Sequence, residues 1–177
     1  PDAKHARVAA NAIRVGSKEL RRPDGAFGDA ILTPTTFLSG GGGLAGTTAD
    51  YLRFAQMLCN GGELDGVRIL GRKTVELMTQ NHLPGGVDLE GFHLRGSYGE
   101  TGFDGVGFGL TMAVGLGQVP TSSIGSAGDF YWGGAASTIF WVDPTEDLVL
   151  VFMTQLMPSG TFNFRGQLKS LVYPALV

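Results

Sequence analysis

The sequence predicts an α/β (α+β) domain in which an antiparallel sheet is flanked by helices. Residues 137–142 and 148–153 are rich in β-branched and aromatic residues, and a turn containing Pro144 separates them. These two segments are expected to form a hairpin at the centre of the sheet. Apolar residues recur at helical spacing between Tyr51 and Cys59 and again near the end of the chain. The 29 glycines among 177 residues indicate many tight loops around the sheet.

The first helix is expected to begin at a capping box and to end at a glycine pair. Thr47 and Asp50 stand three residues apart, as a capping pair does at a helix N-terminus. Residues 60–62, Asn-Gly-Gly, tolerate the positive φ that ends a helix. Cys59, the single cysteine, falls on the apolar face and is expected to be a buried, inert thiol. One cysteine forms no internal disulfide, which leaves both a cytoplasmic and a periplasmic location open.

The middle of the chain alternates between short elements and loops. A small hairpin is expected over residues 64–70, followed by a second helix over 72–81. Residues 84–106 have no period and are expected to be a long loop, and residues 107–115 are expected to be one strand. The last helix is expected to pack on the sheet through an apolar stripe. The stripe consists of Phe164, Leu168, Leu171, Val172 and Ala175.

Composition and charge exclude several classes of partner. The net charge is −3 and the isoelectric point is near 5.5, and no run of Lys or Arg forms a basic stripe, so nucleic acid is not an expected partner. No apolar stretch approaches the length of a membrane span, so a membrane is not expected either. The length fits one domain with its own core, without internal repeats.

The first 38 residues show little periodicity. A short helix or strand edge is expected over residues 3–13 and a turn over 21–25. The chain starts with Pro1, without an initiator methionine or a signal peptide. We therefore expect it to begin within a longer protein or after processing.

Two glycines follow a tryptophan just before the predicted hairpin. Gly133 and Gly134 are expected to lie inside its first strand, where glycine packs poorly. Glycine at such a position usually marks a bulge, or a place where a ligand or another backbone comes close.

The segment from Trp132 to Gly134, followed by a strand and a hairpin, resembles the third motif of the serine β-lactamase and penicillin-binding-protein superfamily. That motif is Lys-Thr-Gly in many members. It is often Trp-Gly-Gly or His-Gly-Gly in the esterase-like branch close to class C β-lactamases. Residues 39–58 and 60–70 resemble the same branch, so the resemblance covers nearly the whole chain. It implies that residues 1–177 are the C-terminal part of one β-lactamase/transpeptidase-like hydrolase domain.

The motif of the nucleophile is absent from this sequence. The family attacks its substrate with the serine of a Ser-x-x-Lys motif, assisted by a Tyr-x-Asn or Ser-x-Asn motif. None of the nine serines is followed by lysine at the third position, and neither assisting motif occurs. The resemblance therefore implies that the missing N-terminal half of the protein supplies the attacking group.

The resemblance also implies roles for the motif itself. The backbone N–H of Ala135, just after the second glycine, would be one of the two donors that stabilise the oxyanion of the tetrahedral intermediate. Gly133 and Gly134 would let the substrate backbone lie close. Trp132 replaces a lysine, and its neutral indole favours a neutral acyl ester over a substrate with a carboxylate. The alternative is that Trp132 is only a core residue beside a glycine-relieved strand.

Aromatic residues near the motif are candidates for the walls of an acyl pocket. Tyr131 precedes Trp132 directly and is expected to contact substrate. The other aromatic candidates are Tyr98, Phe103, Phe108 and Phe130. Ordinary core or loop packing is the alternative for all of them.

Other chemistries find little support in the sequence. His5 lies near an end, His82 is expected to cap a helix C-terminus, and His93 lies in the long loop, so no Ser-His-Asp triad is expected. Residues 39–43 lack the Gly-Lys-Ser/Thr of a phosphate loop, and no cluster has metal-ligand spacing. We therefore expect neither a metal nor a cofactor. Asp143 is expected to be a turn residue.

The function expected from these observations is that of part of a serine hydrolase. The whole protein would cleave a small-molecule carboxylic ester or amide through an acyl-serine intermediate. This chain would supply the oxyanion-hole strand and pocket walls. One alternative is a non-catalytic fold-half or binding module. Another is a D-amino-acid peptidase of the same superfamily, against which Trp132 argues because such substrates often present a carboxylate.

Overall fold

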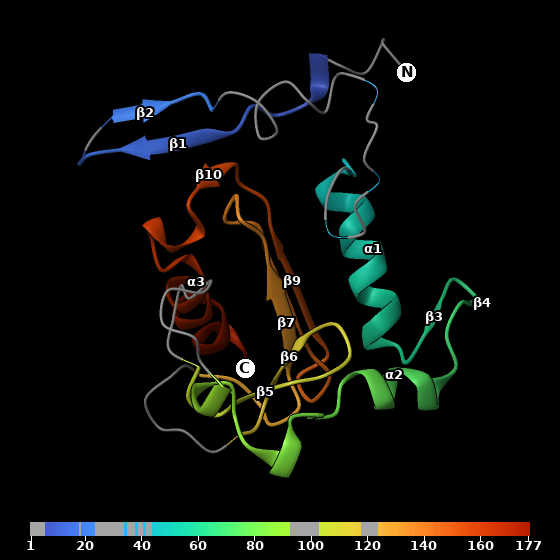
Figure 1. Cartoon of the computed structure of the whole chain (residues 1–177). Helices are drawn as coiled ribbons and strands as arrows, with labels where there is room; N and C mark the ends of the chain where they lie inside the picture. The colour runs from blue at the N-terminus through green and yellow to red at the C-terminus, as the bar shows by residue number, and fades with distance from the viewer. Residues whose placement is uncertain are drawn as a thin grey trace.

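A five-stranded antiparallel sheet organises the chain (Figure 1). In this computed structural model the described residues are 6–17, 19–23, 34, 38, 41, 44–92, 103–117 and 124–177. The sheet runs in sequence order through strands β5 to β9, and each strand pairs antiparallel with the next. The strands are β5 (Val106–Phe108), β6 (Ala113–Gly115), β7 (Phe130–Gly133), β8 (Ile139–Asp143) and β9 (Leu148–Phe152). With helices on both of its faces, the sheet confirms the predicted fold class.

The predicted hairpin is present as β8 and β9, with Ile139 opposite Phe152 and Asp143 opposite Leu148. The prediction that both glycines lie inside its first strand is wrong. Gly133 ends the separate strand β7, and Gly134 lies in the turn that joins β7 to β8. The preference of residues 137–142 for extended structure is broken at Ser137, which adopts φ 64° in this turn.

The single strand predicted over residues 107–115 is also wrong, because the segment folds into the hairpin of β5 and β6. The chain reverses after Gly109, whose N–H donates to the carbonyl of Met112 at 2.8 Å. A Cβ at this glycine would lie 2.0 Å from the carbonyl oxygen of Met78. The reversal is therefore tied to a close approach by another segment, which the alternation of residues in the sequence does not reveal.

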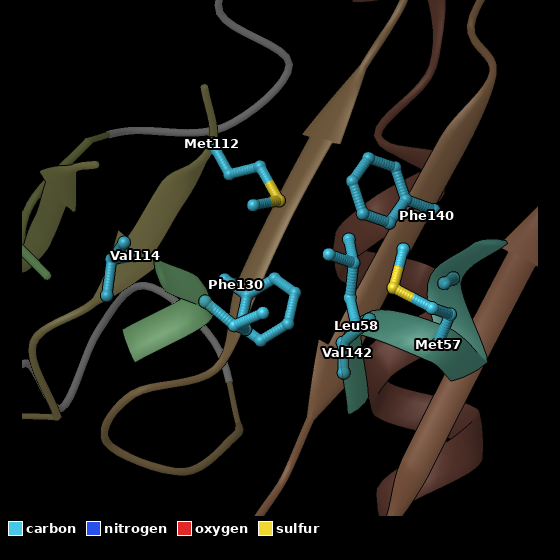
Figure 2. Close-up of a cluster of buried hydrophobic side chains, with 9 residues drawn as sticks. Met57, Leu58, Met112, Val114, Phe130, Phe140 and Val142 are labelled. Carbon is cyan, nitrogen blue, oxygen red and sulfur yellow. The ribbon is translucent and has the colours of Figure 1, made fainter. Parts of the chain in front are cut away.

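Helix α1 (Thr48–Cys59) covers one face of the sheet and packs on β8 and β9. Its capping box is formed as predicted, because Thr47 and Asp50 each bond the other's backbone N–H. The predicted end is also correct: Gly62 has φ 99° and donates its N–H to the carbonyl of Met57 at 2.8 Å. The second half of α1 meets the sheet in an apolar core (Figure 2). Its labelled members are Met57, Leu58, Met112, Val114, Phe130, Phe140 and Val142.

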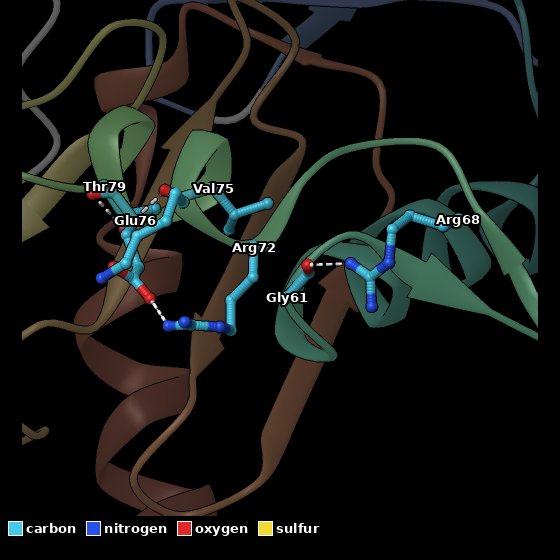
Figure 3. Close-up of polar contacts among 7 residues, drawn as sticks. Gly61, Arg68, Arg72, Val75, Glu76 and Thr79 are labelled. Atoms are coloured by element: carbon cyan, nitrogen blue, oxygen red, sulfur yellow. Dashed lines mark hydrogen bonds and ion pairs between the residues drawn. The ribbon is translucent and has the colours of Figure 1, made fainter.

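Two short elements continue from α1. The predicted hairpin forms from β3 (Glu63–Leu64) and β4 (Val67–Arg68), and helix α2 (Arg72–Met78) follows it. Arg68 donates to the carbonyl of Gly61 at 3.0 Å, which ties the hairpin to the end of α1 (Figure 3). An exposed Arg72–Glu76 ion pair spans one turn of α2.

Helix α2 ends three residues earlier than predicted, and the hydroxyl of Thr79 then bonds the carbonyl of Val75 at 3.0 Å (Figure 3). The predicted helix cap is present, with His82 Nε2 lying 2.7 Å from the carbonyl oxygen of Leu77. In the described part of the long loop that follows, Pro84–Gly86 and Glu90–Phe92 form short 3₁₀ turns.

Helix α3 (Phe164–Val172) covers the opposite face, and a 3₁₀ turn, Tyr173–Ala175, follows it (Figure 1). Phe164, Leu168 and Val172 pack against the second apolar core as predicted. The prediction is wrong for Leu171, which is 72% exposed, and for Ala175, which is also exposed. The spacing of apolar residues predicted the helix correctly, but it assigned two exposed residues to the buried face.

The beginning of the chain is more ordered than its sequence suggests. β1 (Ala12–Val15) pairs antiparallel with β2 (Glu19–Arg21) and parallel with β10 (Leu156–Met157). The predicted helix or strand edge over residues 3–13 thus contains the start of a strand, and Arg21 ends β2 rather than opening a turn. Residues 24 and 25 of that predicted turn lie outside the described residues.

Cys59 is half-buried rather than buried, with its Sγ 3.8 Å from Asp147 Oδ1. Burial, reinforced by this carboxylate, raises the pKa of the thiol to about 11, which agrees with an inert thiol. Among the described helices none is long and apolar enough to cross a membrane. The part of the chain that the structure describes also holds no group of three potential metal-ligating side chains.

Candidate active site

The turn between β7 and β8 is held by hydrogen bonds on both sides. Gly134 donates its N–H to the carbonyl of Thr138 at 2.9 Å, and Ser137 donates its N–H to the carbonyl of Gly134 at 2.9 Å. The hydroxyl of Ser137 donates to the carbonyl of Leu156 at 2.6 Å, and the N–H of Leu156 donates to the carbonyl of Ala136 at 3.0 Å. Because Leu156 belongs to β10, the turn is attached to the small sheet as well as to the large one.

Ala135 lies on this braced turn and is exposed. Within the described residues, its backbone N–H donates no hydrogen bond to another protein group. An N–H on a fixed backbone that donates to no other protein group is the kind of donor that stabilises a developing oxyanion, because it needs little reorganisation during reaction.

The two glycines of the motif each make room for a protein side chain. A Cβ at Gly133 would lie 2.8 Å from Arg165 Nη2, and a Cβ at Gly134 would lie 2.6 Å from Thr138 Oγ1. A close approach was one of the reasons expected for glycine here. The groups that approach come from α3 and from the same hairpin, and the close approach of substrate stays a prediction.

Trp132 lies in β7 and is 39% exposed. It lies opposite Phe140 in the β7–β8 ladder, and the ring of Phe108 meets it edge-on at a centroid distance of 5.1 Å. Trp132 lines a pocket between the sheet and α1. The lining consists of Tyr51, Trp132, Gly133, Thr138, Ile139, Phe140 and Met153. None of these side chains carries a charge.

Tyr131 points to the other face of the sheet and does not join this pocket. It is only 6% exposed and belongs to the core beneath α3. The guanidinium of Arg165 lies 4.5 Å from its ring centroid, and burial raises the pKa of its hydroxyl to about 12. Adjacent residues of a strand point to opposite faces, so Tyr131 and Trp132 are separated by the sheet itself.

The remaining aromatic candidates for the pocket walls lie in different places. Phe108 touches Trp132, whereas Phe130 is buried in the core beneath α1. Phe103 lies on the chain just before β5, outside the pocket lining. Tyr98, His5 and His93 fall outside the described residues, as does most of the glycine run 39–43. Sequence reasoning missed Tyr51, although its position beside a capping box placed it near the first turn of a well-defined helix.

A buried polar network supports β7 and β8 from the α3 side. Lys169 of α3 and Asp129, which precedes β7, form an ion pair at 2.5 Å with both side chains almost fully buried. Burial raises the pKa of Asp129, and the ammonium of Lys169 opposes that rise. The predicted turn residue Asp143 does accept from the N–H groups of Thr145 and Glu146. It is also fully buried, which the sequence did not indicate.

Asp143 accepts further bonds from Tyr173 Oη at 2.7 Å and from Ser126 N–H at 3.2 Å. Burial acts to raise the pKa of this carboxyl, but the bonds from Tyr173, Ser126 and the turn outweigh it, and the pKa is lowered. The hydroxyl of Tyr173 has its pKa raised by burial and by this same carboxylate. The network therefore fixes α3 and its 3₁₀ extension to the two strands that carry the motif.

The chain matches the Beta-lactamase family model over residues 1–172. It belongs to the beta-lactamase family. It is 36% identical over 155 residues to two curated proteins of Mycobacterium tuberculosis, "Uncharacterized protein MT1414" of strain CDC 1551 / Oshkosh and "Protein Rv1367c" of strain H37Rv. Each match covers 86% of this chain and 37% of the relative, so the chain spans little more than a third of the length of these relatives.

Solved structures show the same fold. A mutant of Simvastatin Synthase (LovD) from Aspergillus terreus superposes with a TM-score of 0.70 at 22% identity, over 96% of this chain and 43% of that one. EstCE1, described as a hydrolase with promiscuous acyltransferase activity, superposes with a TM-score of 0.70 at 24% identity, over 93% and 43%. The β-lactamase-like fold and the superfamily implied by the Trp-Gly-Gly resemblance are confirmed.

Proposed function

We propose that this chain is part of a serine hydrolase that cleaves a small-molecule carboxylic ester or amide through an acyl-serine intermediate. The chain supplies the second oxyanion donor and pocket walls, and the remaining N-terminal part of the protein supplies the serine. The observation that carries the proposal is the N–H of the exposed residue Ala135, which donates to no other described protein group and lies on a turn attached to two sheets. Membership of the beta-lactamase family supports the same chemistry.

The β7–β8 turn would contribute to catalysis because negative charge develops on the carbonyl oxygen of the substrate. When the serine oxygen adds to the carbonyl carbon, the carbonyl π electrons move onto oxygen and a negative charge develops there. A backbone N–H aimed at that position stabilises the transition state more than the neutral substrate. Collapse of the intermediate expels the alcohol or amine and leaves the acyl-serine, which water then hydrolyses.

The neutral pocket favours an ester over the two other family substrates. No charged side chain lines it, so it offers nothing to pair with the carboxylate of a β-lactam or a D-alanyl peptide. Rates of the full-length protein on p-nitrophenyl butyrate, a chromogenic cephalosporin and a D-Ala-D-Ala peptide test this preference. Cleavage of the peptide alone would replace the ester proposal with a peptidase, and no turnover or acylation would indicate a binding module.

The role of Ala135 is tested by a matched pair of variants in the full-length protein. Ala135→Pro removes the N–H, and Ala135→Gly keeps it. Loss of one oxyanion donor lowers kcat by about 100-fold or more, so the proline variant is expected to lose that much while the glycine variant stays near the parent. A folded proline variant with parental kcat would contradict the role. Intact mass after mixing with the butyrate ester checks the mechanism separately, because an acyl adduct on a serine outside this chain is expected.

A further inference from the structure

Tyr51 forms one side of the pocket that Trp132 lines. It stands in the first turn of α1, where its N–H donates to the carbonyl of Thr47 at 3.1 Å. The capping box of Thr47 and Asp50 fixes the start of this helix. The side chain of Tyr51 therefore leaves the helix from a well-defined position.

Two neighbouring rings hold the phenol of Tyr51 in place. The ring of Phe140 lies 5.3 Å away, centroid to centroid, and the ring of Phe54 meets it edge-on at 5.6 Å. Such aromatic pairs restrict the ring that they contact. Tyr51 is nevertheless 37% exposed, so part of the ring stays open toward the pocket.

The chemistry of the pocket specifies an uncharged guest. Phe140, Ile139 and Met153 are apolar lining residues, and Tyr51 and Thr138 are the lining residues that carry hydroxyl groups. Desolvation raises the pKa of the Tyr51 hydroxyl, so it stays neutral at ordinary pH. Apolar walls with a few polar atoms are typical of sites for small neutral groups.

The pocket adjoins the donor of the proposed function. Gly133 lines it and ends β7, two residues before Ala135 of the braced turn. A group bound beside Gly133 would therefore lie next to a residue only two positions from Ala135, whose N–H would donate to the oxyanion. This relation connects the pocket to the acyl part of an ester, the part that stays on the enzyme after the alcohol leaves.

We propose that Tyr51 is a specificity-determining residue whose ring limits the length of an uncharged, apolar acyl group bound between α1 and Trp132. This inference rests on the proposed function for its acyl assignment. The occupancy of the pocket by a neutral apolar group does not depend on catalysis. The two parts can therefore be tested separately.

The first test compares acyl chain lengths in the full-length protein. Values of kcat/KM are measured for p-nitrophenyl acetate, butyrate and hexanoate. A few methylenes gained or lost in an apolar pocket change kcat/KM by about 10-fold or more. Tyr51→Ala is therefore expected to raise the hexanoate-to-acetate ratio by about 10-fold, and Tyr51→Phe to restore the parental ratio. Leu52→Ala is the matched control, because Leu52 is an exposed neighbour that does not line the pocket.

The outcomes of this test are distinct. An unchanged ratio in Tyr51→Ala, with ester turnover preserved, would overturn the role of Tyr51 and leave the proposed function intact. The same shift in Leu52→Ala would also overturn it, because the effect would then belong to α1 as a whole. Absence of ester turnover in the parent protein would count against the proposed function instead.

A binding measurement tests the pocket without any turnover. The full-length protein is labelled with 3-fluorotyrosine, and the Tyr51 resonance is assigned in the ¹⁹F spectrum by its loss in Tyr51→Phe. Hexanamide is then added as the neutral probe, and succinamate as a charged one. We expect a saturable shift of the Tyr51 signal with hexanamide and a much weaker one with succinamate. A signal that hexanamide leaves unmoved would overturn the inference whatever the protein catalyses.

Discussion

The two faces of the large sheet are built on different chemistry. On the α3 face, a buried Lys169–Asp129 ion pair and the Tyr173–Asp143 bond lie beside the apolar core. On the α1 face, the core is apolar, and Phe140 belongs both to this core and to the lining of the pocket beside Trp132. Directed polar contacts accept few arrangements, whereas apolar surface accepts guests of varied shape. The polar contacts of the α3 face therefore position the strands, whereas binding at the α1 face belongs to the proposed function.

The largest effect is expected from breaking the buried ion pair. Lys169→Met leaves the Asp129 carboxylate buried without its partner, and such changes cost about 3–5 kcal/mol. Denaturant unfolding of the full-length protein measures the loss. Lys73→Met is the control, since its pair with Glu76 is exposed and should leave the free energy of unfolding nearly unchanged. Equal losses in the two variants would show that the α3 face is not held by its ion pair.

Tyr131 and Trp132 are neighbours in sequence that lie on opposite faces of the sheet. Tyr131→Ala removes a buried ring and should lower the free energy of unfolding by about 3 kcal/mol, with little change in KM for esters. Trp132→Ala removes a half-exposed ring and should cost about 1 kcal/mol while raising KM. Unfolding curves and steady-state kinetics of both variants provide the check. A rise in KM confined to Tyr131→Ala would reverse the assignment of the two faces.

An effect smaller than those of Lys169→Met and Tyr131→Ala concerns the acid dependence of the α3 face. The pKa of Asp143 is lowered in the folded protein, so its contribution to stability is present above its unfolded pKa of about 4 and is lost as the pH falls further. Tyr173→Phe removes one bond to this carboxylate and should cost about 2 kcal/mol at pH 7. The pKa of Asp143 should rise in this variant.

The pH test combines carboxyl NMR titration of Asp143 with unfolding at pH 7 and pH 4. The difference in stability between parent and Tyr173→Phe should shrink at the lower pH. Asp65→Asn serves as the comparison, because Asp65 is exposed and pairs only with Arg53 among the described residues. A constant difference across the pH range would mean that Tyr173 acts through packing alone.

Local signals in the sequence predicted the elements that depend on local interactions. The capping box at Thr47, the turn at Asp65 and the β8–β9 hairpin are each specified by residues a few positions apart, and each is present. The reversal at Gly109 was missed because its cause is the carbonyl of Met78, a contact between distant segments. The pairing of β1 with β10 was not predicted, because it joins segments from the two ends of the chain.

The candidate site was predictable only in part for the same reason. The Trp-Gly-Gly motif can be recognised in the sequence alone, and it predicts Trp132 and Ala135 as candidate site residues. Which face each side chain occupies depends on register, and the register excluded Tyr131 from the pocket. Tyr51 reaches the pocket from a helix about 80 residues earlier, a distance over which no periodicity in the sequence carries information.

The hydrogen bonds between the β7–β8 turn and β10 also affect when this turn forms during folding. β10 is paired with β1, so the turn that carries Ala135 depends on a contact between the first and last parts of the chain. Contacts with such large sequence separation close the longest loops and tend to form late in folding. The β7–β8 turn should therefore be among the last parts to become rigid, after the β8–β9 hairpin and α1 have docked. Ester turnover would then recover more slowly than the bulk of secondary structure when the unfolded protein is returned to native conditions.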